Sequence, residues 1–234
     1  MFFKSVFFSL RIFLGKYPNL FFLIYGLKKR NKNLFINTKT RLVVSAYPRT
    51  ANTFFIIALQ QIQKQPISIA HHLHVPALAL KGIKKKIPTV ILIRNPKDSI
   101  VSLVIREKHI SVRQAINAYI SFYLPLLKYK DKILIIEFST IINDFPSVIT
   151  KINSKYQLGL NNYSERLPLN EEKIFKEIES INKKFNKNNL IESMVSRPSQ
   201  NRKESSLIYK TRLEQKKNTI KLKQCYMIYE SLLA

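Results

Sequence analysis

The sequence predicts an α/β protein in which a central parallel sheet lies between two layers of helices, a three-layer sandwich. Two observations predict this fold. Short apolar runs rich in β-branched residues alternate along the chain with longer segments of helical pattern, which indicates right-handed βαβ units. The runs are continuously apolar, as parallel strands are when helices cover both faces of their sheet. Ligands bind at the carboxyl ends of such strands, so the segments that follow the strands are the first candidates for a site.

Each element is predicted from its own local pattern. The strands are four short apolar runs. A helix is also expected to begin at Asn95, because a capping asparagine there precedes a proline in the first turn and an aspartate three residues later. The predicted strands are Arg41–Ala46, Pro66–Ala70, Thr89–Ile93 and Lys132–Phe138. The other predicted helices are Thr53–Lys64, Pro76–Lys86, Ser111–Lys128, Thr140–Tyr156, Asn170–Phe185 and a segment from Arg202 to the C-terminus.

The N-terminal segment, residues 1–40, is distinguished from the main domain, residues 41–234, by its large apolar residues. Its longest stretch without a charge, Tyr17–Leu27, contains a proline and is shorter than the roughly 20 residues that a spanning helix needs. Arg11 divides the apolar run and no small-residue cleavage site follows, so a signal peptide is not predicted. Two alternatives stay open: a basic amphipathic segment that touches a membrane surface through residues 1–27, or a pair of helices packed on the main domain.

The composition is strongly basic. Lys and Arg number 40 against 14 Asp and Glu, a formal net charge of +26, and this excess favours an anionic partner such as phosphate, nucleic acid, sulfated sugar or acidic lipid. An AT-rich coding sequence gives a similar abundance of Lys, Ile, Asn, Phe and Tyr, so the charge alone does not identify the partner. The single cysteine, Cys225, excludes an intrachain disulfide framework and a multi-thiolate metal site.

A turn that can bind phosphate follows the first predicted strand. The segment Tyr47–Phe54, YPRTANTF, leads from a strand through a tight turn into a helix, where backbone N–H groups and the helix dipole favour an anion. Arg49 adds a forked cation suited to phosphate or sulfate oxygens, and Thr50, Asn52 and Thr53 add side-chain donors. The turn is not a Walker A loop, since it lacks the Lys-Ser/Thr pair. The alternative is an ordinary capped helix beside a solvated arginine.

A second such turn follows the third predicted strand. In the segment RNPKDSIVS, Arg94 leaves the strand end and Ser102 lies on the second turn of the following helix. An arginine at a strand end and a serine on the next helix can converge on one anion from two sides. The alternative is a well-capped helix, which also explains Asp98.

Histidines gather in the segment HHLHVP, which starts at His71 and ends at Pro76. Transfer of a group to a hydroxyl needs a base, and histidine is the usual one near neutral pH. If the segment is extended, His72 and His74 point to the same side. A metal site built on these two side chains and a merely structural cluster are the alternatives. His109 lies in a charged stretch and is expected on the surface.

Together the two turns resemble the sulfotransferase family. The first is similar to the family's 5′-phosphosulfate loop, Tyr-Pro-Lys/Arg-Ser/Thr-Gly-Thr/Asn-Thr-Trp, and the second to its 3′-phosphate segment, Arg-Asn-Pro-Lys/Arg-Asp-x-x-x-Ser. The resemblance covers roughly residues 41–138. It implies a P-loop-NTPase-like sandwich, the donor 3′-phosphoadenosine 5′-phosphosulfate (PAPS), the product 3′,5′-ADP, and transfer of a sulfuryl group to a hydroxyl or amine without a metal.

The resemblance also implies roles for particular residues. His74-Val75-Pro76 matches the family's His-Leu-Pro, so His74 is the expected general base. His72 stands at the family's Lys position and is the second candidate. Arg49 would stabilise the leaving phosphate. The residues expected to bind the donor are Arg49, Thr50, Ala51, Asn52, Thr53, Phe54, Arg94 and Ser102, together with Arg202 and Lys203, which are similar to the family's C-terminal Arg-Lys-Gly.

The sequence departs from the family at three of these positions. Ala51 stands where the family has glycine, and alanine tolerates a positive φ poorly. Phe54 replaces the usual tryptophan. Glu204 replaces the glycine of the C-terminal element and adds a negative charge.

Three functional classes are therefore compared. The first is a PAPS-dependent sulfotransferase whose acceptor is a carbohydrate, a lipid-linked molecule or a small molecule, with no nucleic acid partner. The second is a non-enzymatic basic protein that binds nucleic acid or an acidic membrane. The third, a Mg²⁺-dependent kinase or NTPase, is disfavoured by the missing Lys-Ser/Thr pair. A cytoplasmic location is expected, with the N-terminal segment able to touch the inner face of the membrane.

Overall fold

The computed structural model describes residues 2–26, 34–161, 170–186, 188–189 and 200–234, without the side chains of residues 185 and 200–204. A sheet in which every neighbouring pair of strands is parallel lies at the centre, in the order β2-β1-β3-β4. The strands are β1 Leu42–Ala46, β2 Ile69–Ala70, β3 Thr89–Ile93 and β4 Leu134–Glu137. This arrangement confirms the fold class that the sequence predicts.

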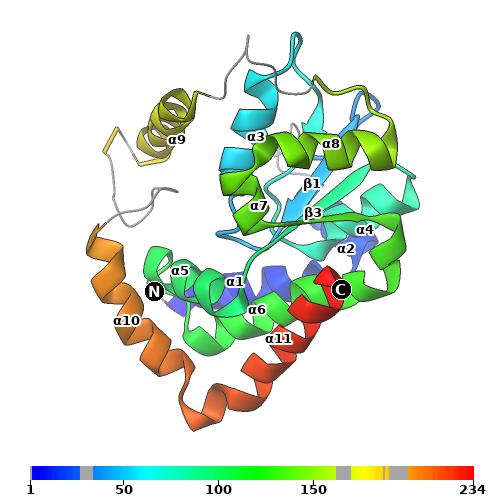
Figure 1. The fold of residues 1–234 in the computed structure, drawn as a ribbon. Coiled ribbons are helices and arrows are strands. Elements are labelled where there is room, and N and C mark those ends of the chain that lie inside the picture. The colour runs from blue at the N-terminus through cyan, green and yellow to red at the C-terminus, as the bar shows by residue number, and fades with distance from the viewer. Residues whose placement is uncertain (1, 27–33, 162–169, 187, 190–199) are drawn as a thin grey trace.

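Helices cover both faces of the sheet (Figure 1). In the described residues they are α1 Phe2–Leu14, α2 Pro18–Gly26, α3 Asn52–Gln61, α4 Pro76–Lys84, α5 Pro96–Arg106, α6 Val112–Tyr123, α7 Phe138–Asn143, α8 Phe145–Tyr156, α9 Glu171–Phe185, α10 Gln200–Leu213 and α11 Thr219–Leu233. The helices α3, α7, α8 and α9 pack on one face, whereas α5, α6 and α11 pack on the other. A third cluster joins α1, α2 and α4 to β1 and β2.

The strands alternate their side chains between the two helical layers. In β1, Leu42 and Val44 enter the core on the α3 face, while Val43 packs with α2 and α4. In β3, Leu92 faces the α3 layer and Ile93 faces the α5 and α6 layer. All of these side chains are fully buried, as strands covered on both faces require.

The N-terminal segment forms two helices that pack on the rest of the chain. One side of α1 contacts α6, and α2 contacts α4. Gly15 follows α1 so close to Val75 that a Cβ at this position would lie 2.5 Å from the Val75 Cβ. Both helices are therefore attached to the α4 and α6 layer. Among the residues that the structure describes, no helix has the length and apolar character needed to cross a membrane.

Two of the predicted helices are interrupted in the structure. The helix that the sequence places over Ser111–Lys128 ends at Tyr123, and a 3₁₀ segment, Leu124–Lys132, continues it. Pro125 lies at the start of that segment and cannot donate to the helical ladder. The predicted helix Thr140–Tyr156 is two helices, α7 and α8, because the Asp144 side chain accepts a hydrogen bond from the Ser147 N–H at 3.1 Å and starts a new helix.

The predicted C-terminal helix is also divided, since α10 ends at Leu213 and α11 begins at Thr219. The predicted strand Pro66–Ala70 narrows to the two residues of β2. By contrast, the strand Thr89–Ile93 and the helix start after Asn95 are confirmed.

Candidate functional site

The two turns singled out in the sequence meet at the carboxyl edge of the sheet. The strands β1 and β3 are parallel neighbours, with Ala46 paired to Leu92, so the segments that follow them emerge side by side. The Arg49 Nε–H donates to the Ser102 hydroxyl at 3.0 Å, and the Arg94 guanidinium donates to the Arg49 carbonyl at 3.2 Å. Two segments far apart in the chain are thereby joined by direct hydrogen bonds.

The first turn has the backbone shape of a tight anion-binding loop. Arg49 has φ 71° and Ala51 has φ 60° and ψ 20°, both in the left-handed region. The buried Thr50 hydroxyl donates to the Tyr47 carbonyl at 2.7 Å and closes the turn. A left-handed conformation costs an L-residue roughly 1–2 kcal/mol. Ala51 thus adopts the geometry that a glycine would accept freely, at the cost of strain.

At the start of α3, the Asn52 side chain is buried without a hydrogen-bond partner among the described residues, at either its amide nitrogen or its oxygen. The hydroxyl of Ser45, near the end of β1, is likewise buried without a hydrogen-bond partner among the described residues. Leaving a buried polar group unpaired costs about 1–3 kcal/mol. The Asn52 amide lies on the first turn of α3, beside the first backbone N–H groups of that helix, a place suited to an anion. For this amide, a bound ligand is the simplest source of the missing partners.

Arg94 is held between an aromatic ring and the backbone. Its guanidinium lies over the Phe138 ring, 4.0 Å from the centroid, and its carbonyl accepts a hydrogen bond from the Tyr119 hydroxyl at 3.1 Å. Burial lowers the pKa of Arg94, and the nearby Asp98 carboxylate raises it. An arginine keeps its charge under these conditions, so a fixed cation stands at the end of β3.

The predicted cap of the second turn is present. The Asn95 side chain accepts a hydrogen bond from the Lys97 N–H at 3.0 Å, with Pro96 in the first turn of α5. This cap fixes the direction of α5 and so the place of Ser102. The two interpretations of the segment, a capped helix and one side of an anion site, are compatible in this geometry.

Three tyrosines of the α6 layer hold the ends of the strands. The hydroxyl of Tyr47 donates to the Ala115 carbonyl of α6 at 3.1 Å. In the opposite direction, Tyr119 of α6 donates to Arg94, and Tyr123 donates to the Leu92 carbonyl at 2.8 Å. The rings of Tyr47 and Tyr119 also pack edge to face, with centroids 5.2 Å apart. Helix α6 therefore supports both turns from behind.

His74 lies directly beside this edge. Its Nδ1 is 2.9 Å from the Ala46 carbonyl, the last residue of β1. A carbonyl only accepts, so Nδ1 carries the hydrogen and Nε2 carries the lone pair. Burial, with the positive charges of Arg11 and Arg106, lowers the pKa of His74 to about 4, although the bond to Ala46 raises it. The imidazole is neutral at pH 7 and can accept a proton at Nε2.

His72 is engaged at both ring nitrogens. Its Nε2 is 3.1 Å from the Thr53 hydroxyl of α3, and its Nδ1 contacts the Nδ1 of His71. Burial, with its histidine neighbours and Arg106, lowers its pKa far below the usual range. The histidine segment is not extended, because His72 has φ 61° and His74 has φ 49°; the two rings nonetheless pack with centroids 5.7 Å apart.

Two arginines that were not predicted as site residues also influence the histidine segment. The Arg11 guanidinium of α1 donates to the Leu73 carbonyl at 2.5 Å, and its burial lowers its pKa. Arg106, at the end of α5, lowers the pKa of His72 and of His74 by its charge. The one signal available in the sequence was that Arg11 interrupts an apolar run. In the described part of the chain, no group of three or more His, Cys, Asp or Glu side chains is arranged to hold a metal ion.

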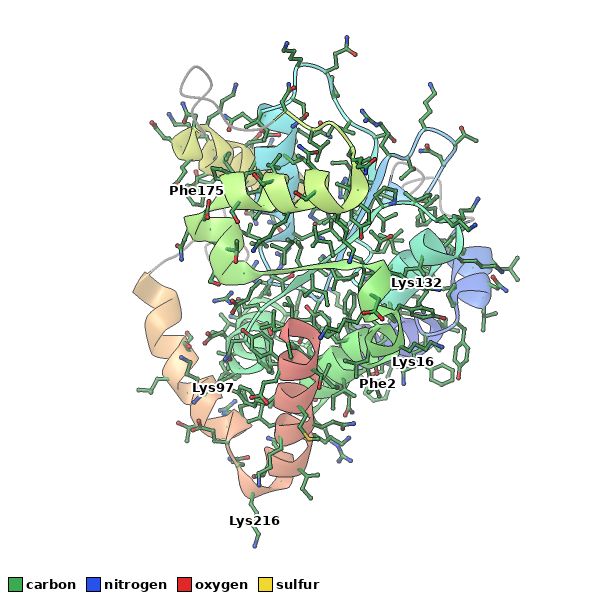
Figure 2. All side chains as sticks on the ribbon, turned by 45° about the vertical axis from the view of Figure 1, so that its right-hand side comes forward. Phe2, Lys16, Lys97, Lys132, Phe175 and Lys216 are labelled. Atoms are coloured by element: carbon green, nitrogen blue, oxygen red, sulfur yellow. The ribbon has the colours of Figure 1, made fainter. Side chains whose placement is uncertain are left out.

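The remaining predicted residues lie in two places. Phe54 packs in the core beneath the turn, with its ring centroid 6.3 Å from Phe145. Arg202 and Lys203 lie on the first turn of α10, and their side chains are outside the described residues. The helix itself packs along α5, where the Lys97 ammonium pairs with Glu214 beyond its end (Figure 2). The helix that carries the third predicted element thus reaches the helix that carries Ser102.

The fold is similar to that of a solved sulfotransferase. The crystal structure of mouse sulfotransferase SULT7A1 complexed with PAP aligns with 84% of this chain and 86% of its own, with a TM-score of 0.50 and 15% sequence identity. No protein-family model matches the sequence, and no curated protein is similar to it at the level of sequence. At this identity the likeness concerns the fold, an α/β fold shared with a sulfotransferase.

Proposed function

We propose that the protein is a sulfotransferase that moves the sulfuryl group of PAPS to a hydroxyl or amine of an acceptor. The observation that carries the proposal is the junction of the two turns by Arg49 and Ser102, directly beside a neutral imidazole at His74. The fold shared with a sulfotransferase in complex with PAP supports it.

The donor nucleotide would lie across the carboxyl ends of β1 and β3. Arg49, the N-terminus of α3 and the buried amide of Asn52 would hold the 5′-phosphosulfate. Arg94 and Ser102 would hold the 3′-phosphate, with Arg202 and Lys203 as further candidates. Recognition of the 3′-phosphate is what would distinguish PAPS from ATP.

The reaction is an in-line displacement at sulfur. The acceptor oxygen or nitrogen forms a bond to sulfur while the bond between sulfur and the bridging oxygen of the 5′-phosphate breaks. His74 takes the acceptor proton at Nε2, and the negative charge that develops on the leaving phosphate is stabilised by Arg49 and the loop N–H groups. His72, with both nitrogens engaged, would orient Thr53 and the loop.

Isothermal titration calorimetry with 3′,5′-ADP, 5′-AMP and ATP at two salt concentrations tests the donor site. The proposal requires 3′,5′-ADP to bind much more tightly than the other two, with a preference that persists at high salt. Equal binding of all three, falling steeply with salt, would instead identify a basic protein that binds polyanions through its charge.

Transfer itself is tested with radiolabelled PAPS and pooled acceptors of carbohydrate, lipid-linked and small-molecule type. Transfer that is unaffected by EDTA agrees with the proposal, whereas transfer from ATP that EDTA abolishes would identify the kinase or NTPase alternative.

A further inference from the structure

Helix α1 has large apolar side chains on both of its sides. Phe8, Ile12 and Leu14 pack against the rest of the protein. On the same helix, the Ser5 hydroxyl is 3.1 Å from the Gln114 amide oxygen of α6, and the Gln114 amide donates to the Ser9 hydroxyl at 2.8 Å. On the solvent side, Phe2 is 74% exposed and Phe3 is 85% exposed, whereas a helix that only covers a core in water has a polar outer side.

The exposed apolar residues form one continuous face. On α1 they recur three or four residues apart, the spacing that keeps side chains on one side of a helix, and they continue onto α2, where Leu23 is 69% exposed. We call this surface the apolar face; its residues are Phe2, Phe3, Val6, Phe7, Leu10, Phe13, Tyr17, Leu20, Leu23 and Ile24. Contiguous exposed patches of large apolar side chains mark interaction sites.

Lysines lie beside the apolar face, and the two helices that form it contain no Asp or Glu. Lys4 and Lys16 are exposed at the two ends of α1, and no Asp or Glu precedes Asp98 in the sequence. Next to α2, the Lys81 ammonium lies over the Phe22 ring, 3.9 Å from its centroid. Aromatic and aliphatic side chains beside lysines are the composition of a helix that lies in a membrane interface.

A shallow pocket opens beside the same helix. It has a volume of about 430 Å³ between α1, α6 and α11, and its lining includes Phe8 and Phe13 together with Lys16 and Lys221. Phe13 belongs both to this pocket and to the apolar face. The rest of the lining is mixed, with Ser9, Gln114, Asn117, Ser121 and Gln224 beside the aromatic and aliphatic side chains. The Lys221 ammonium donates to the Asn117 side chain at 2.7 Å. Such a site suits an anionic headgroup.

We propose that α1 and α2 dock the protein on an anionic lipid bilayer. The apolar face enters the boundary between headgroups and acyl chains, and Lys4, Lys16 and Lys221 meet the lipid phosphates. The two helices lie on the surface, as their division by Pro18 and their attachment to α4 and α6 require.

The docking helix is also joined to the histidine segment. Arg11 of α1 holds the Leu73 carbonyl, and Gly15 lies against Val75, so both contacts flank His74. Docking would therefore place the histidines at a fixed position behind the membrane surface. The proposal stands on the geometry of α1 and α2 and does not depend on the sulfotransferase activity.

The absence of tryptophan from the sequence allows a direct test with the full chain. Phe3→Trp on α1 and Leu23→Trp on α2 each introduce a single fluorophore on the apolar face. Ile142→Trp on α7, across the sheet from α1, is the matched control, since Ile142 is also an exposed apolar residue. The probes are vesicles of phosphatidylcholine with phosphatidylserine and vesicles of phosphatidylcholine alone.

The expected result is a blue shift of the Phe3→Trp and Leu23→Trp emission, with quenching by brominated lipid, on phosphatidylserine vesicles only. The emission of Ile142→Trp stays unchanged. In co-sedimentation, Phe3→Ser with Leu23→Ser lowers the partition coefficient by about tenfold or more, since each apolar side chain loses its burial, whereas Ile142→Ser leaves it unchanged. Higher salt weakens binding of the wild-type chain.

Three outcomes would overturn the proposal. The first is vesicle binding without any shift at either reporter. The second is a shift of equal size at Ile142→Trp, which would indicate adsorption in no fixed orientation. The third is a blue shift without vesicles that depends on protein concentration, which would identify a second copy of the chain as the occupant of the apolar face. None of these outcomes changes the binding of 3′,5′-ADP measured by calorimetry. A failure of the membrane proposal can therefore be distinguished from a failure of the proposed donor site.

Discussion

The Arg49 Nε atom and the Ser102 hydroxyl oxygen lie 3.0 Å apart although 53 positions separate them in the chain. The serine thereby holds the guanidinium of a left-handed residue in a fixed direction. In the proposed reaction, the charge would be in place before the donor binds, so little reorganisation would be needed when negative charge develops on the leaving phosphate.

Arg49→Ala is expected to lower the rate of sulfuryl transfer by about 10²–10³-fold, the usual effect of removing one donor that stabilises a developing oxyanion. The measurement is the rate of transfer from radiolabelled PAPS under saturating donor. Arg113→Ala removes an exposed arginine of α6 and is expected to retain the wild-type rate. Equal rates in Arg49→Ala and in the wild type would remove Arg49 from the mechanism.

His74→Ala is expected to lower transfer by about 10²–10⁴-fold, because it removes the imidazole that we propose takes the acceptor proton. 3′,5′-ADP should bind to the variant with nearly unchanged affinity, as calorimetry can measure. His109→Ala, which loses a histidine that lies 3.8 Å from Glu107 and away from the cluster, is the control. Full activity in both His74→Ala and His72→Ala would show that neither histidine is the base.

Acid should destabilise the protein in a defined window. Burial lowers the pKa of His71 and of His74 from 6.5 to about 4, so between these values the unfolded chain binds protons that the folded chain excludes. The free energy of unfolding is therefore fully retained above pH 6.5 and falls as the pH drops towards 4, by about 1.4 kcal/mol per pH unit for each histidine. Urea unfolding at a series of pH values measures the slope.

His71→Gln should reduce that slope by the contribution of one histidine. A slope that is the same in His71→Gln and in the wild type would contradict the assignment of the acid sensitivity to the histidine segment.

Ala51→Gly is expected to stabilise the protein by about 0.5–1 kcal/mol, because glycine adopts φ 60° without the steric cost that alanine bears. For a chain of this length that corresponds to a rise of roughly 2–4 °C in Tm per kcal/mol, measurable by circular dichroism. Ala58→Gly, in the middle of α3, is the control and is expected to lower Tm, since glycine there destabilises the helix. A lower Tm for Ala51→Gly would indicate that the methyl group contributes packing that outweighs its strain.

Local patterns predicted the parts of the fold that depend on near neighbours. The strand Thr89–Ile93 and the cap at Asn95 are where the sequence places them, because a β-branched apolar run and an Asn-Pro pair act within a few residues. The two turns were predicted to face phosphate from equally local patterns, and that role stays a prediction. Their meeting at one edge of the sheet follows from the parallel pairing of β1 and β3.

Features that depend on distant contacts were not predictable. The proximity of Arg11 to the histidines requires α1 to pack beneath the loop at Leu73, and no local pattern encodes that contact. The left-handed backbone of His72 and His74 replaced an expected extended segment, since even histidine, which is enriched among non-glycine residues at positive φ, adopts it in only a small fraction of cases. One wrong boundary was not due to distant contacts: the helix ends at Tyr123, just before Pro125, a local signal that the predicted helix Ser111–Lys128 nevertheless included.

The tyrosine hydroxyls that run between α6 and the strand ends have a thermodynamic consequence. Hydrogen bonds of Tyr47 and Tyr119 connect the segments after β1 and β3 to α6, and Tyr123 connects α6 to Leu92 within β3. Detachment of either segment would therefore break a buried hydrogen bond to the same helix. Amide protons of both segments should then exchange with solvent at similar rates, in a single cooperative opening that includes α6.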